Sequence, residues 1–337
     1  MCPAVSSNPE NLPEPIRVDL VIPVYNEEEV LTGFHRQLVS AIDPLPYQFR
    51  ILYINDGSKD HTAEVLEGLA KKDPRLVILE LSRNFGHQAA LTAGLDAADA
   101  DYVISMDGDC QHPPELIAEM LKLAQSGYDA VLTQRLEETN QSYFKKFSSD
   151  LFYKLLNYIG NTEVQPGSAD FRLLSRQVVT SLRAMPEYHR FLRGMVAWVG
   201  YKTVILPFKP PARLAGKSKY SLKKMIALSM DAVFSFSLIP LYIGISLGAV
   251  MLILALAEMA YVLSFWISGQ QSGLAPGWSS LMFVLLVIGG FLMITLGFIG
   301  VYVGYIFQEV KRRPIYLVRN IFSSNPTQKN IQENDPA

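Results

Sequence analysis

Apolar segments alternate with amphipathic segments through the first part of the chain. Short runs rich in aliphatic residues, such as VDLVIPVY at 18–25, are typical of buried strands. Segments with a helical period, such as EEEVLTGFHRQLVSAI at 27–42, separate these runs. The alternation predicts an α/β domain with a doubly wound, mainly parallel sheet. The predicted strands are residues 18–25, 49–55, 76–81, 102–107 and 128–134.

The pattern changes after residue 237, where two long apolar stretches follow. Each exceeds the roughly 20 apolar residues that a membrane-spanning helix needs. Between 238 and 308 the only charged residue is Glu258, whereas cations crowd both flanks, at 217–224 and 311–313. By the positive-inside rule, this pattern predicts two transmembrane helices whose outer ends both lie in the cytoplasm. A buried helical hairpin in a large soluble protein is the alternative interpretation.

Composition limits the classes of protein to consider. The 337 residues, of which 49% are hydrophobic and 18% charged, are enough for about two domains. A formal net charge of −2 gives no support for nucleic-acid binding, which usually needs a basic face. Cys2 and Cys110 form no disulfide framework and favour a reducing compartment. The N-terminal residues lack the pattern of a signal peptide and predict a flexible segment.

Polar side chains follow three of the predicted strands. Ligands of a doubly wound sheet bind at the carboxyl ends of its strands, so these side chains predict one crevice. Neither a G-x-G-x-x-G motif nor a Walker lysine loop is present, so a phosphorylated ligand needs another source of positive charge. The polar ends are Pro23, Tyr25, Asn26 and Glu27; Asn55, Asp56, Gly57 and Ser58; and Asp107, Asp109, Gln111 and His112.

Asp107 and Asp109 are one residue apart, and in an extended chain they point to the same side, with Gln111 next on that side. Mg²⁺ and Mn²⁺ prefer oxygen ligands, and commonly take one or two carboxylates together with diphosphate oxygens. The three side chains therefore predict a Mg²⁺ or Mn²⁺ site for a diphosphate ligand. The alternative is that the two acids only cap the following helix, which Pro113 and Pro114 introduce.

Five motifs along the chain resemble those of the family 2 glycosyltransferases of GT-A fold. In order they are VIPVYNEE, NDGSKD, SRNFGHQAALTAGL, DGDCQHPPE and SADFRLLSR. The resemblance is strongest to the polyisoprenyl-phosphate branch, which includes bactoprenol glucosyltransferases and dolichol-phosphate mannose synthases. It implies an inverting transfer of one sugar, UDP-glucose being the favoured donor, to a lipid phosphate such as undecaprenyl or dolichyl phosphate. The QxxRW motif of processive synthases is absent, and FLRGM stands roughly in that region.

The resemblance also implies roles for individual residues. Pro23, Tyr25, Glu27 and Asp56 would frame the nucleoside, with Asp56 accepting a hydrogen bond from the base. Asp107 would join this donor site through the metal. The acceptor needs cations, because a lipid phosphate must approach an anionic sugar nucleotide, and arginine can hold phosphate bidentately. The acceptor candidates are Arg135, Arg172, Arg176, Arg213, Lys217 and Lys219, with Ser175 adding a hydroxyl contact.

Asp170 and Asp109 are the predicted catalytic residues. In many inverting relatives with hydroxyl acceptors a carboxylate deprotonates the nucleophile. A phosphate monoester is already anionic near neutral pH, so Asp170 is expected to be essential either as a base or by orienting the acceptor or binding Arg172. Asp109 would act through the metal, which offsets charge on the departing diphosphate.

The last part of the chain suggests how the protein assembles. EVKRRPIYLVRNIF starts with cations that suit a cytoplasmic headgroup layer, and IYLVRNIF predicts a short strand. Such a strand needs a partner edge. Pairing with a neighbouring subunit predicts a homo-oligomer, possibly a tetramer, and pairing within the chain is the alternative.

These patterns together predict a multi-pass protein of the plasma (inner) membrane with a cytoplasmic catalytic domain. An inactive membrane protein that binds nucleotide sugars is the alternative function, and a transporter that flips the lipid product is a third. The predicted parts are a flexible segment at 1–16, a GT-A catalytic domain at 17–215, an interfacial amphipathic segment at 216–237, a two-helix transmembrane region at 238–308 and a cytoplasmic arm at 309–337.

Overall fold

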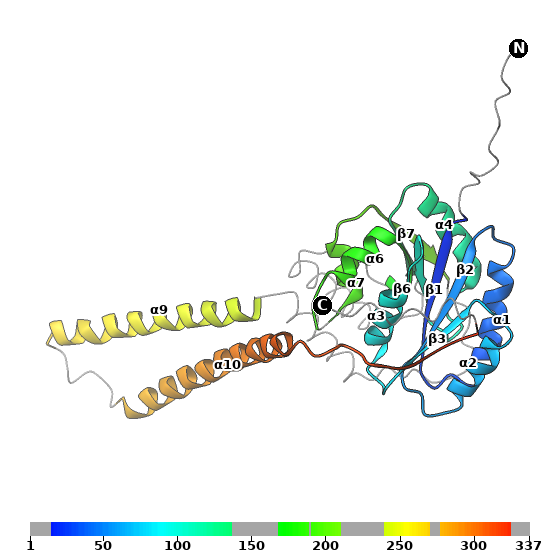
Figure 1. Ribbon diagram of the computed structural model, residues 1–337. Helices are drawn as coiled ribbons and strands as arrows, with labels where there is room; N and C mark the ends of the chain where they lie inside the picture. The colour runs from blue at the N-terminus through cyan, green and yellow to red at the C-terminus, as the bar shows by residue number, and fades with distance from the viewer. Residues whose placement is uncertain (1–14, 137–167, 189, 210–238, 270–276, 325–337) are drawn as a thin grey trace, which may run out of the picture. The chain divides into compact units, whose positions relative to one another are not determined.

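The computed structural model of the chain describes residues 15–136, 168–188, 190–209, 239–269 and 277–324. They belong to two compact units. The first unit holds an eight-stranded sheet and its helices, and it includes the residues that follow Arg313. The second unit holds two long helices, α9 (Ile239–Ile267) and α10 (Trp278–Lys311) (Figure 1). The predicted interfacial segment at 216–237 lies outside the described residues.

The sheet has the strand order β7-β5-β6-β4-β1-β2-β3-β8. Four neighbours, β3, β2, β1 and β4, run parallel, as the sequence predicts. β6 runs antiparallel between β4 and β5, and β8 runs antiparallel to β3. This mixed sheet confirms the predicted α/β class. The strands are β1 (Arg17–Val24), β2 (Gln48–Asn55), β3 (Leu76–Leu81), β4 (Tyr102–Ser105), β5 (Ala130–Arg135), β6 (Ser168–Ser175), β7 (Thr203–Phe208) and β8 (Val318–Ser323).

Helices cover both faces of the sheet in layers (Figure 1). On one face lie α1 (Leu31–Ile42), α2 (Thr62–Ala70), η1 (Pro114–Leu116) and α4 (Ile117–Gln125). On the other face lie α3 (His87–Ala97), α6 (Arg176–Arg183) and α7 (Leu192–Trp198). Gly94 lets α3 approach β1 closely, because a Cβ at this position would collide with the side chain of Val21.

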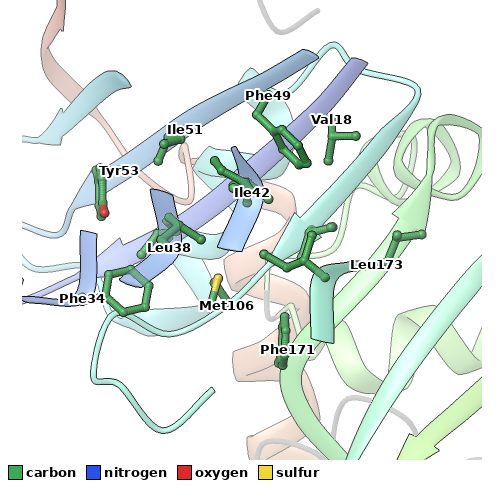
Figure 2. Close-up of a cluster of buried hydrophobic side chains, with 14 of the residues drawn as sticks. Val18, Phe34, Leu38, Ile42, Phe49, Ile51, Tyr53, Met106, Phe171 and Leu173 are labelled. Atoms are coloured by element: carbon green, nitrogen blue, oxygen red, sulfur yellow. The ribbon is translucent and has the colours of Figure 1, made fainter. Parts of the chain in front are cut away.

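The main hydrophobic core lies under α1. Figure 2 shows Phe34 and Ile42 of this helix in the same cluster of buried side chains as Phe49 of β2, and all three side chains are at most 8% exposed. Phe171 and Leu173 of β6 belong to the same core. Because side chains alternate along a strand, Asp170 and Arg172 of β6 project to the opposite face, where α3 and α7 lie. The packing of the core therefore determines which face receives these two charged residues.

The expectation of membrane helices is confirmed in part. Among the residues that the structure describes, one segment, Val287–Lys311 of α10, is long and apolar enough to cross a membrane. α9 contributes a shorter apolar segment, Ser246–Tyr261. The described residues thus show one candidate span instead of the predicted two. Within this unit α9 and α10 pack together, with Gly244 against Thr295.

The C-terminal arm forms the predicted strand, β8, which pairs within the chain. β8 pairs with β3 of the same chain, and Ser82 N donates to Leu317 O at 2.8 Å. The Tyr316 hydroxyl donates to Asp96 of α3 at 2.9 Å, and Arg319 binds Glu80 of β3. This pairing is the one within the chain that the sequence left open, and it covers the otherwise open edge of β3. Exchange with a neighbouring subunit stays a prediction.

Candidate active site

Two loops at the carboxyl ends of β1 and β2 hold each other in place. Asn26 N donates to Ser58 Oγ at 3.0 Å, and Lys59 N donates to the Asn26 side chain at 2.8 Å. Glu27 N donates to Thr62 Oγ1 at 3.0 Å. These bonds fix the predicted donor residues of the first loop. Tyr25 and Glu27 follow β1 and are both partly exposed, whereas Pro23 is buried within β1.

Asp56 lies at the end of β2, where it holds the turn that precedes α3. Its two carboxylate oxygens accept hydrogen bonds from Phe85 N at 2.7 Å and Gly86 N at 2.9 Å. Burial raises the pKa of Asp56, and this effect outweighs the two backbone hydrogen bonds that lower it. Gly57, at φ 63°, packs its Cα against the backbone of Arg83 in the same turn. Asp56 therefore holds the backbone of the turn at Phe85 and Gly86. Its hydrogen bond to the base of a bound nucleotide stays a prediction.

The loop after β4 does not have the extended geometry that the sequence predicted. β4 ends at Ser105, and Cys110 has a left-handed backbone at φ 60°. The cause is a local turn, because the carboxylate of Asp109 accepts hydrogen bonds from Gln111 N at 3.0 Å and Gln111 Nε2 at 2.6 Å. Gln111 thus lies beside Asp109 through this turn and not through the alternation of a strand.

Arg135, at the end of β5, joins the loop that carries the two acids. Its Nη1 donates to Gln111 Oε1 at 3.1 Å, and its Nη2 lies 3.4 Å from His112 Nε2. His112 is 1% exposed, stacks on Phe171, and accepts a hydrogen bond from Asp107 N at Nδ1 (2.9 Å). Burial lowers the pKa of His112, so the ring is a neutral support for the Asp107 backbone.

Asp170 is the centre of a buried ionic cluster. Arg193 of α7 binds both carboxylate oxygens, at 3.1 Å through Nε and 2.8 Å through Nη2, and Arg172 pairs with Oδ1. Burial alone would raise the pKa of Asp170, but Arg193 and Arg172 hold it well below its usual range. An ionised carboxylate whose oxygens are already bound is a poor proton acceptor. Of the roles considered for Asp170, orientation through its arginine partners fits this geometry best.

His87 lies between the acids on the two sides of the crevice. Its Nε2 is 3.5 Å from Asp107 Oδ1 and 3.4 Å from Asp170 Oδ2, and its side chain is 42% exposed. Burial would lower the pKa of His87, but Asp170 and Asp107 raise it. The carboxylate of Asp107 carries a buried oxygen, Oδ1, that accepts no hydrogen bond.

Three residues of this site were missed by the sequence reasoning. His87 and Gln88 follow the turn in SRNFGHQAALTAGL, and Arg193 lies in FLRGM. Gln88 Oε1 accepts a hydrogen bond from Leu192 N at 3.3 Å and so joins α3 to α7 directly. His87 and Arg193 join the same two helices through Asp170. Both segments lie in the part of the chain that resembles the family, which was the only signal available. Neither has a residue spacing that is typical of a binding site.

The structure places the predicted acceptor residues apart from one another. Arg172 pairs with Asp170 in the candidate site and is only 3% exposed. Ser175 lies opposite Tyr102, at the edge of the sheet where β4 begins. Arg176 is at the same edge and binds Asp99. The remaining candidates, Arg213, Lys217 and Lys219, lie outside the described residues.

The acids after β4 fit a cation whose remaining ligands are the oxygens of a diphosphate. Within the described ranges no group of three or more His, Cys, Asp or Glu side chains is placed to hold a metal by itself. Asp107 nevertheless offers a buried carboxylate oxygen without a hydrogen bond, in the same loop as Asp109. Two carboxylates are the usual protein contribution where phosphate oxygens complete the coordination.

Comparison with known proteins identifies the class to which this fold and site belong. The chain is 38% identical over 307 residues to an uncharacterized glycosyltransferase of Synechocystis sp., a match that spans 91% of this chain and 96% of the relative. It is 36% identical over 314 residues to the bactoprenol glucosyl transferase of Shigella phage SfII, spanning 92% and 100%. The protein is therefore an enzyme, a glycosyltransferase. Residues 19–183 match the model of glycosyl transferase family 2, and the chain belongs to this family.

A solved structure with a similar arrangement is mannosyl-3-phosphoglycerate synthase from Rubrobacter xylanophilus. It matches 65% of this chain and 72% of its own, at 18% identity and a TM-score of 0.45. A similarity of this size has no bearing on function. The family membership rests on the sequence relatives, and it confirms the resemblance that the five motifs indicated.

Proposed function

We propose that the protein transfers one glucosyl unit from UDP-glucose to a polyisoprenyl phosphate at the cytoplasmic face of the membrane. The product is a lipid-linked sugar donor for modification of cell-envelope glycan or lipopolysaccharide. The observation that carries this proposal is the 36% identity to a bactoprenol glucosyl transferase over 92% of this chain and the whole of that relative. A match of such extent includes both the sheet and the apolar helices that follow it.

The proposed reaction needs no strong base. A phosphate oxygen of the lipid attacks the anomeric carbon of the sugar and forms the new C–O bond. The bond from that carbon to the diphosphate breaks, its electron pair leaves with UDP, and the configuration is inverted. Because the attacking phosphate is already anionic, Asp170 is assigned to hold Arg172 and Arg193 instead of removing a proton.

On the donor side, Tyr25, Glu27 and Asp56 surround the nucleoside, and Asp107 and Asp109 hold Mg²⁺ or Mn²⁺ with Gln111 beside them. When bound, the cation supplies Lewis-acid charge that stabilises the departing diphosphate. The buried carboxylate oxygen of Asp107 that accepts no hydrogen bond supports this assignment. On the acceptor side, Arg135 reaches the loop that carries these acids through its hydrogen bond to Gln111. Arg213 and Lys217 are further acceptor ligands in the proposal.

The pairing of β8 with β3 supports two membrane crossings. Residues before α9 and residues after α10 belong to one folded sheet, so both must lie on the same side of the membrane. A chain that crosses once through α10 must then cross a second time before it, and α9 is the apolar helix available. The basic residues at the end of α10 favour the cytoplasm for the sheet. Assembly into a homo-oligomer remains a prediction.

Transfer of radiolabelled glucose by the purified full-length protein tests the proposal. With UDP-glucose, undecaprenyl phosphate and Mg²⁺ or Mn²⁺, we expect labelled lipid in which the anomeric carbon of the glucose has the inverted configuration. A panel of other nucleotide sugars with the same lipid defines the donor, and soluble sugars serve as control acceptors. Tight binding of nucleotide sugars without transfer from any donor would instead support the inactive binding protein and refute the enzyme assignment for this acceptor.

A further inference from the structure

A continuous series of side-chain contacts crosses the candidate active site. It runs from Asp107 to His87 (3.5 Å), from His87 to Asp170 (3.4 Å) and from Asp170 to Arg193 (2.8 Å). Asp107 follows β4, His87 begins α3, Asp170 belongs to β6 and Arg193 belongs to the first turn of α7. The loop after β4 and three elements, α3, β6 and α7, are therefore joined through one imidazole and one carboxylate.

His87 is placed to set the orientation of the Asp107 carboxylate. Two imidazoles flank this carboxylate, with His87 Nε2 3.5 Å from Oδ1 and His112 Nε2 3.7 Å from Oδ2. His112 also binds the backbone of Asp107 and is almost completely buried, so it fixes one side. On the other side Oδ1 accepts no hydrogen bond, and His87 Nε2 is the charged group that faces it. Groups that orient a ligating carboxylate or imidazole tune the affinity of a metal site.

The other end of the series is held firmly. Asp170 is fixed at its backbone by Ser105 Oγ, which donates to its carbonyl at 2.7 Å, and at its carboxylate by two nitrogens of Arg193. Beside these contacts, Gln88 Oε1 accepts the Leu192 N–H. The adjacent residues His87 and Gln88 thus connect the start of α3 to the start of α7, Gln88 directly and His87 through Asp170.

We propose that His87 is a positioning residue that orients Asp107 for metal and donor binding and couples this acid, through Asp170 and Arg193, to helix α7. The inference rests on the proposed function in one respect, namely that Asp107 serves a metal-bound nucleotide. It assigns no proton transfer to His87. The residue acts through Asp107, and its loss is expected to weaken metal binding before any chemistry takes place.

Calorimetric titration of Mn²⁺ into the full-length protein with saturating UDP, without lipid acceptor, tests this role. His87→Ala should lower the Mn²⁺ affinity by about 10- to 100-fold, the usual effect of removing a group that orients a metal ligand. His87→Gln should recover part of the loss, because its amide N–H can reach toward Asp107 in place of Nε2. Arg193→Lys, which cannot bind Asp170 with two nitrogens, should also weaken Mn²⁺ binding although Arg193 lies beyond Asp170.

The control is His61→Ala, because the His61 side chain is 82% exposed. Its one ion pair among the described residues is with Glu64. Unchanged Mn²⁺ affinity in His87→Ala, or failure of His87→Gln to exceed His87→Ala, overturns the positioning role. Unchanged affinity in Arg193→Lys overturns the coupling to α7. Failure of the unmodified protein to bind Mn²⁺ with UDP would instead refute the proposed donor site. In turnover assays, a role in positioning predicts recovery of His87→Ala by high Mn²⁺ concentration.

Discussion

At the scale of residues, Asp170 shows how one carboxylate can be needed for both stability and activity. It is 6% exposed and faces two arginines, of which Arg172 is itself 3% exposed. A buried guanidinium without a counter-ion is costly, so Arg172 depends on Asp170 for its place in the fold. The same carboxylate touches His87 at the open side of the crevice. Loss of Asp170 therefore acts on the protein in two ways.

Asp170→Asn is expected to lower the free energy of unfolding by about 3 kcal/mol or more, because the neutral amide leaves Arg172 without its counter-ion in a buried site. Transfer activity should be lost as well. Urea unfolding and the transfer assay measure the two effects. The matched control is Asp99→Asn, at an exposed ion pair with Arg176, which should change stability by less than about 1 kcal/mol. Full stability combined with lost activity would favour the base role over the anchoring role.

The sequence predicted which acids lie in the crevice more accurately than how they are arranged. Asp56 and Asp107 follow strands and Arg135 ends one, so their place at the carboxyl ends of the strands could be deduced from the strand pattern alone. The turn at Asp109 could not, because it depends on a side chain that bonds to backbone two residues ahead. His87 and Arg193 were missed because they meet only through Asp170, between segments separated by about 100 residues of chain.

At the scale of elements, the parallel strands and α1 were predictable because each carries its own periodic pattern. β1, β2 and β3 lie within a residue of their predicted bounds. β6 and β7 were not predicted as strands, although SADFRLLSR was recognised as a motif. The reason lies in β6 itself, where charged Asp170 and Arg172 occupy one face and interrupt the apolar pattern of a central strand. Their partners come from α3 and α7, which a local pattern does not reveal.

A second buried network connects α1, β2 and the loop before β3. His35 Nδ1 lies 3.2 Å from the Tyr53 hydroxyl, and His35 Nε2 lies 3.8 Å from Asp73, which Arg75 also binds. Burial lowers the pKa of His35 below its ordinary value of 6.5, and this effect outweighs the attraction of Asp73. Burial would raise the pKa of Asp73, but hydrogen bonds from Arg75 lower it.

This network predicts a loss of stability on acidification. Because the pKa of His35 is lower in the folded protein, the unfolded chain binds more protons as the pH falls below 6.5, and the folded state is destabilised. Asp73 adds a further loss only below its ordinary pKa of 3.8. In urea unfolding between pH 7 and pH 5, His35→Gln should show a weaker dependence on pH than the unmodified protein, by at most about 1.4 kcal/mol per pH unit.

The control for this measurement is His61→Gln, because that side chain is exposed and should leave the pH dependence unchanged. Equal pH dependence in His35→Gln and in the unmodified protein would show that burial of His35 is not the source of the effect.

At the scale of the whole molecule, the sheet includes segments from both sides of the helical pair, and this constrains the topology. With cysteines introduced singly into a protein whose own cysteines are replaced by serine, Lys59→Cys and Arg313→Cys should react only from the cytoplasm. Ser268→Cys, at the end of α9, should react only from outside. Labelling of intact cells and of inverted vesicles with an impermeant maleimide measures the three positions.

Each outcome bears on one helix. If Ser268 and Lys59 are labelled from the same side, α9 does not cross the membrane. If Ser268 and Arg313 are labelled from the same side, α10 does not cross. Lys59 and Arg313 on opposite sides would contradict the pairing of β8 with β3, because both strands belong to one sheet.

The pairing of β8 with β3 also determines the order of events during synthesis. Glu80 of β3 and Arg319 of the strand that covers it are 239 residues apart in the chain. At a rate of about 5 to 20 residues per second, a ribosome needs roughly 10 to 50 s to make the intervening segment. During this interval the β3 edge has no strand to pair with, while the apolar helices are being delivered to the membrane. The nascent sheet is therefore most exposed to aggregation or chaperone binding at β3, until the last strand leaves the ribosome.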